Sequence, residues 1–82
     1  MHLGAGGQLR VLKAERANWV AFGVFCEGAF LDYGSLGEEA PDVLLTLPLG
    51  MIEIRTVDAD WRMDSRFVDL RAGQVAEVMI GD

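Results

Sequence analysis

Residues Trp19–Cys26 read WVAFGVFC, and this run is the strongest strand signal in the chain. Side chains alternate between the two faces of a strand. Here the face that carries Val20 and the face that carries Trp19 are both apolar. A run that is apolar on both faces is expected to be covered on both, so it predicts a central strand or one packed under a neighbouring layer. Gly23, in the middle of the run, marks a bulge or a bend.

Upstream of this run, residues 8–14 also alternate and predict a strand. A helix near residues 9–18 is the alternative, because Leu9, Leu12 and Trp19 fall near helical spacing. A strand is favoured because no capping residue precedes Gln8. Downstream, apolar or alternating runs predict five further strands, at residues 29–33, 43–47, 51–57, 61–70 and 74–80.

Turn signals separate these runs at intervals of about 8–12 residues. Pro48 presets the backbone of one hairpin turn, and Gly50 and Gly73 are expected to supply positive φ angles. Residues 34–42 contain two glycines and a proline and predict the longest loop. Together these signals predict an all-β fold, a small antiparallel β-sandwich of about seven strands. The alternative is an α+β fold with a helix near residues 9–18.

The chain has 82 residues, enough for one hydrophobic core. Residues 1–7 are predicted to be a flexible lead-in, and residues 8–82 a single sandwich domain. Thirteen acidic residues against seven basic ones give a net charge of −6. Such a charge disfavours direct binding to nucleic acid or to an anionic membrane surface. No apolar run reaches the roughly 20 residues of a membrane span.

Cys26 is the one cysteine, so no internal disulfide can form. A lone thiol without a preceding secretory signal predicts a cytoplasmic protein. The alternative is a bacterial envelope location, if the segment belongs to a longer exported chain.

The region from about residue 26 to residue 80 resembles a PEGA domain, a small prealbumin-like β-sandwich. Residues 27–29 (EGA) match three letters of its motif, with Cys26 in place of the proline, and residues 32–34 (DYG) stand where the family has an Asp-Gly turn. Residues 47–50 (LPLG) resemble its turn into a strand, and residues 68–74 (VDLRAGQ) resemble its closing hairpin. The resemblance implies a non-catalytic module that mediates binding or spacing, typically in envelope-associated proteins.

Reactive groups do not converge in the sequence, so we expect no enzyme, cofactor or metal. His2 is the one histidine and lies in the lead-in, and Cys26 has no histidine partner and is expected to be inert. Residues 58–64 superficially resemble a calcium loop, but Met63 stands where that loop needs glycine and no glutamate closes it. A hydrated turn is the favoured interpretation.

The candidate binding surface joins exposed aromatic and acidic residues. Packing in the core is the default for tryptophan and tyrosine, but beside polar residues they are preferred binding anchors. The residues assigned to this surface are Tyr33, Glu38, Glu39, Asp58, Asp60, Trp61 and Arg62.

Three functions follow from these features. The first is a non-enzymatic protein-interaction or structural module that binds a protein partner, or itself, through a sheet edge and the aromatic and acidic patch. The alternative is a small acidic inhibitor of a basic enzyme or nucleic-acid-binding protein, which clustering of Glu27, Asp32, Glu38, Glu39 and Asp42 would favour. The third, a carbohydrate-binding module, needs Trp61, Tyr33 or Trp19 exposed and coplanar.

Overall fold

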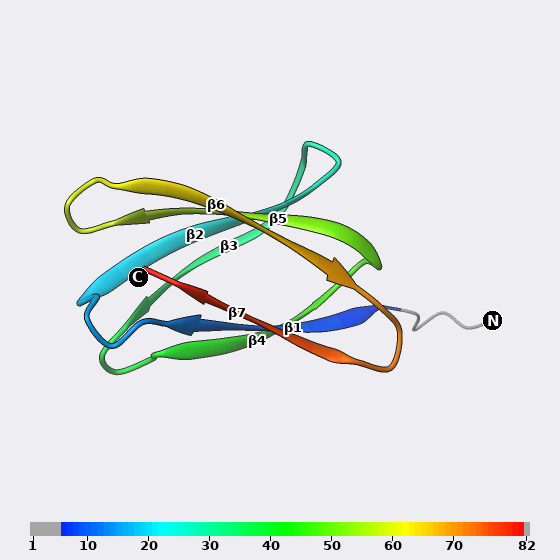
Figure 1. Cartoon of the computed structure of the whole chain (residues 1–82), viewed down its shortest axis with the longest axis horizontal. Coiled ribbons are helices and arrows are strands. Elements are labelled where there is room, and N and C mark those ends of the chain that lie inside the picture. The colour runs from blue at the N-terminus through cyan, green and yellow to red at the C-terminus, as the bar shows by residue number, and fades with distance from the viewer. Residues whose placement is uncertain (1–5, 82) are drawn as a thin grey trace.

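The computed structural model describes residues 6–81, which form seven strands and no helix (Figure 1). The strands are β1 (Gly7–Lys13), β2 (Trp19–Cys26), β3 (Ala29–Gly37), β4 (Asp42–Leu47), β5 (Gly50–Asp58), β6 (Met63–Leu70) and β7 (Val75–Ile80). The predicted all-β fold is confirmed, and the alternative of a helix near residues 9–18 is wrong. Leu9 and Val11 are both fully buried, so a period of two residues governs this segment. Residues 1–5 of the predicted lead-in lie outside the described residues, and Gly7 already belongs to β1.

The strands form two packed sheets. One has three strands in the order β4-β1-β7, and the other has four strands in the order β3-β2-β5-β6. Three connections gather at one end of the sandwich, between β1 and β2, between β3 and β4, and between β5 and β6 (left in Figure 1). The other three gather at the opposite end. No helix of the described residues could cross a membrane.

One strand pair differs from the antiparallel prediction. β1 and β7 run parallel, with Leu9 opposite Ala76 and Val11 opposite Val78, whereas all other pairs are antiparallel. After β6 the chain passes to the three-stranded sheet and runs in the same direction as β1 (Figure 1). This crossing places β7, the last strand, beside β1, the first.

The core lies between the sheets and consists of alternate residues of every strand. Each large aliphatic side chain buried there contributes about 1.5–3 kcal/mol. The buried core residues are Leu9, Val11, Val20, Phe22, Val24, Leu36, Leu47, Ile52, Ile54, Leu70, Val78 and Ile80.

The predicted long loop over residues 34–42 is wrong in its first part, because β3 continues to Gly37. Leu36 is buried in the core, and Gly34 lies under the ring of Phe22 on the neighbouring strand. An aromatic ring that covers a glycine on an adjacent strand compensates for its missing side chain. The loop is therefore shorter than predicted, and β3 pairs with β2 along the whole length of β2.

The turn predictions at Gly50 and Gly73 are confirmed, with φ angles of 118° and 77°. Both angles lie in a region that favours glycine. The turn between β5 and β6 differs, because a residue other than glycine has the positive φ angle there. The predicted strand over residues 61–70 starts only at Met63, because Trp61 has a φ of 63° and belongs to the turn.

Candidate functional site

The outer face of the four-stranded sheet is the most distinctive surface of the molecule. β2 lies between β3 and β5, as predicted for a central strand, and its core face is buried. The expectation that both of its apolar faces are covered is wrong, since no layer of the described residues lies over the outer face. Trp19 is exposed there and Phe25 is half-buried. The apolar side chains of this face therefore meet solvent.

A β-bulge gathers aromatic rings on this face. Val24 pairs with Asp32 but Phe25 pairs with Phe30, so Leu31 is an extra residue in β3. Residues three positions apart in a regular strand point to opposite faces. The bulge allows Phe30 and Tyr33, which are three positions apart, to share one face, and it turns Leu31 towards the core. As a result, Phe30 lies between two rings, with centroids 5.7 Å from Phe25 in edge contact and 6.0 Å from Tyr33 in a stacked contact.

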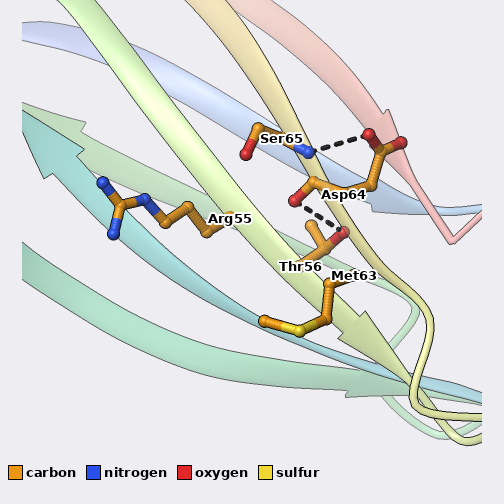
Figure 2. A pocket seen from close by; sticks show the side chains of 5 residues that line it. All are labelled: Arg55, Thr56, Met63, Asp64 and Ser65. Carbon is orange, nitrogen blue, oxygen red and sulfur yellow. Dashed lines mark hydrogen bonds between the residues drawn. The ribbon is translucent and has the colours of Figure 1, made fainter.

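The other half of the face comes from β5 and β6. The strand register sets Phe67 opposite Glu53 and Met63 opposite Val57, and it places Met51 on the same side. Figure 2 shows Arg55, Met63 and Ser65 extending from one side of this strand pair, with the Asp64 carboxylate on the other. A shallow depression of about 400 Å³ lies along the pair. We call the set Phe25, Phe30, Tyr33, Met51, Met63 and Phe67 the aromatic face.

One ion pair lies between the two halves of the aromatic face. The guanidinium of Arg55 stacks 4.2 Å from the centre of the Phe25 ring, and its Nε lies 3.1 Å from the Glu53 carboxylate. The hydrogen bond and the negative charge of Glu53 raise the pKa of Arg55 above its usual value. Arg55 thus stays positively charged and covers the Phe25 ring, and the carboxylate of Glu53 balances its charge.

The exposed apolar area of this face is large. The exposed fractions are 57% for Phe30, 75% for Tyr33, 64% for Phe67, 54% for Met51 and 83% for Met63. With about 200 Å² for each side chain, they present on the order of 700 Å². For comparison, the largest contiguous apolar patch of a typical monomer is about 300–600 Å², whereas here the total is divided in two by the Glu53–Arg55 pair. The outer face of the opposite sheet also exposes Leu44, Val75 and Met79, but it carries no aromatic ring, and Arg10 pairs there with Asp42 and Glu77.

The predicted site residues are divided between two places. Tyr33 lies on the aromatic face, whereas Asp58, Asp60, Trp61 and Arg62 form the turn between β5 and β6. Glu38 and Glu39 follow β3 at the same end of the sandwich as that turn, because Trp19 pairs with Gly37 and Val20 pairs with Asp58. The structure therefore gathers six of the seven residues at one end and separates Tyr33 from them.

A hydrogen-bonded turn holds Trp61 outwards. The Asp58 carboxylate accepts hydrogen bonds from the backbone N–H groups of Asp60 and Arg62, both at 2.9 Å, and the Trp61 N–H donates to the Asp58 carbonyl. Trp61 is 83% exposed. A groove of about 460 Å³ runs beside this turn. Its walls include Arg16, Asn18, Trp19, Asp60 and Arg62.

Replacing Trp61 with glycine is expected to raise the free energy of unfolding by up to about 1 kcal/mol, because a left-handed backbone costs an ordinary residue about 1–2 kcal/mol. Replacing it with alanine keeps the strain and is expected to change stability by less than about 0.5 kcal/mol. Urea denaturation measures both. A loss of more than about 1 kcal/mol in both variants would show that the indole stabilises the fold.

The remaining candidates for chemistry are not brought together. Glu27 lies in the β2–β3 turn, at the end of the sandwich opposite Glu38 and Glu39, so the acids that would favour an inhibitor do not share one surface. Among residues 6–81, no three His, Cys, Asp or Glu side chains are grouped to hold a metal ion. Neither Trp19 nor Trp61 contacts another aromatic ring of the described chain.

No protein-family model, curated protein or solved structure matches the chain. The resemblance to PEGA domains therefore stays a prediction.

Proposed function

We propose that this chain is a non-enzymatic protein-interaction module that binds through the aromatic face. The observation that carries this proposal is the concentration of exposed rings and methionines on one uncovered sheet. Aromatic and methionine side chains are enriched at protein interfaces, where their burial supplies most of the binding free energy. The bulge at Leu31 supports the same conclusion, because bulges often redirect side chains at functional positions.

The two edges of this sheet are less suited to binding than its face. On β3 the Asp32 carboxylate accepts a hydrogen bond from the Tyr33 N–H, and on β6 Asp64 does the same for the Ser65 N–H. Carboxylates beside an edge hinder the addition of another strand. We therefore propose that the binding surface is the face of this sheet and not the sheet edge expected from the sequence.

The polar groups of the face favour binding over catalysis. Arg55 is paired with Glu53, so neither is free to transfer a proton to a substrate. The depression beside them is shallow and open, whereas catalytic and small-molecule sites are usually enclosed.

The test compares the proteins that bind to three immobilised forms of the chain. The first is the natural chain, the second carries Tyr33→Ser and Phe67→Ser on the aromatic face, and the third carries Leu44→Ser and Val75→Ser on the outer face of the other sheet. Quantitative mass spectrometry of extracts from the source cells measures what each form binds. We expect the second form to lose at least about 90% of a bound partner that the other two keep, because removing a hot spot weakens binding by a factor of 30 or more.

All four replaced residues are exposed, so circular dichroism is expected to show three equally folded forms. The proposal is wrong if the three forms bind the same proteins in the same amounts.

A further inference from the structure

We infer that the aromatic face binds a second copy of this chain, so that two sandwiches stack with these faces together. This inference rests on the proposed function and names its partner. It has three supports, which are the area of the face, its charge and the shape of a sheet.

The area of the face fits a dimer. Stable protein interfaces bury about 800 Å² on each partner. The exposed apolar side chains of the aromatic face alone present on the order of 700 Å². A complete contact would also cover the stems of Glu53 and Arg55 between them. The uncovered area is thus sufficient for one further layer of the same size.

The charge of the face favours a copy over a basic partner. The acids that the register places on this face are Glu53 and Asp69. Glu53 is paired with Arg55, and Asp69 lies 3.0 Å from Arg71. The face is therefore close to neutral, although the chain carries a net charge of −6. A basic protein would be drawn to other surfaces, whereas two such faces meet without like-charge repulsion.

The shape of the face allows this packing. Two sheets pack face to face about 10 Å apart when their side chains interdigitate. In a symmetric dimer the same patch serves both copies. A two-fold axis parallel to the strands would set the β2–β3 half of one copy against the β5–β6 half of the other. The register would then set Phe30 at the level of Phe67, and Tyr33 at the level of Ser65, between Phe67 and Met63. Contacts between sulfur and aromatic rings are favourable.

Sedimentation velocity of the full chain over a range of concentrations tests the inference. The natural chain is expected to sediment as a dimer, and the Phe30→Ser, Phe67→Ser double variant as a monomer whose dissociation constant is higher by about 100-fold or more. The matched Leu44→Ser, Val75→Ser variant is expected to remain dimeric. If the double variant fails to fold, Tyr33→Ser alone replaces it, because Tyr33 lies on the edge strand β3 and is more exposed than Phe30. Because the contact is apolar, the dimer is expected to persist in 1 M salt, where the Debye length is only about 3 Å and charge interactions are screened.

Three results would overturn the inference, and they separate it from the proposed function. A natural chain that stays monomeric while its aromatic face still binds another protein would overturn the inference of a dimer but not the proposed function. A dimer unaffected by the double variant but broken by the control would place the interface on the other sheet. A monomer that binds nothing through this face would overturn both proposals.

Discussion

The Ile54→Ala variant is expected to lose about 2–5 kcal/mol of unfolding free energy. Ile54 is fully buried in β5, where it pairs with Val24 of β2 and Arg66 of β6. Its removal leaves a cavity that neighbouring strands, held by their hydrogen bonds, cannot close completely. Single domains have total stabilities of about 5–15 kcal/mol, and short chains fall at the lower end. The variant is thus expected to be partly unfolded at physiological temperature.

Urea denaturation at 25 °C measures this loss, with Met51→Ala as the control. Met51 lies on the same strand but is exposed on the aromatic face, so its replacement is expected to cost less than about 0.5 kcal/mol. Because burial is the main difference between the two positions, equal losses would mean that the assigned core is incorrect. The comparison is made at a concentration where both variants are monomeric, since dimerisation also stabilises the folded state.

Removing β7 by ending the chain at Gln74 is expected to abolish folding. β7 is hydrogen-bonded only to β1, and it supplies Val78 and Ile80 to the core. Without it, Leu9 and Val11 would lose their core neighbours on one side, and β1 would be left in a two-stranded sheet, which is marginal in stability. Amide chemical shifts in a ¹H–¹⁵N correlation spectrum are expected to collapse to the narrow range of an unfolded chain.

A synthetic peptide that spans β7 is expected to restore the dispersed spectrum when added in excess, because strand pairing and core burial can be supplied by a separate chain. The matched control is Met79→Ser in the full chain, since this side chain lies on the exposed side of β7. A dispersed spectrum from the truncated chain alone would contradict the role assigned to β7.

Sequence patterns predicted all seven strands, and most directly those whose two faces have different surroundings. In β5 the buried Ile52 and Ile54 alternate with Glu53 and Arg55, and local periodicity identifies such a strand. The turns at Gly50 and Gly73 were also predictable, since their backbone angles favour glycine. The parallel pairing of β1 with β7 was not, because it depends on how the chain crosses between sheets after β6.

The candidate site was predictable only in part. Tyr33 was recognised as a surface aromatic residue, whereas Phe30 and Phe67 were not. Whether a second sheet covers an apolar face depends on contacts between distant segments, and WVAFGVFC reads the same with or without that cover. The bulge or bend predicted at Gly23 is found one residue later, as a register shift between Val24 and Phe25, and its extra residue is Leu31 of β3, which the sequence did not identify. The apolar outer face of β2 and the assignment of Tyr33 to the surface were the two signals that pointed towards the aromatic face.

The parallel pairing of β1 with β7 has a mechanical consequence. β1 begins at one end of the sandwich and β7 ends at the other (Figure 1). A tension applied between the start of β1 and the end of β7 would pull these two strands past each other along their length. All the hydrogen bonds of the ladder would then bear the load together rather than opening one at a time. Pulling at these two ends is therefore expected to need more force than peeling β7 from β1 one hydrogen bond at a time.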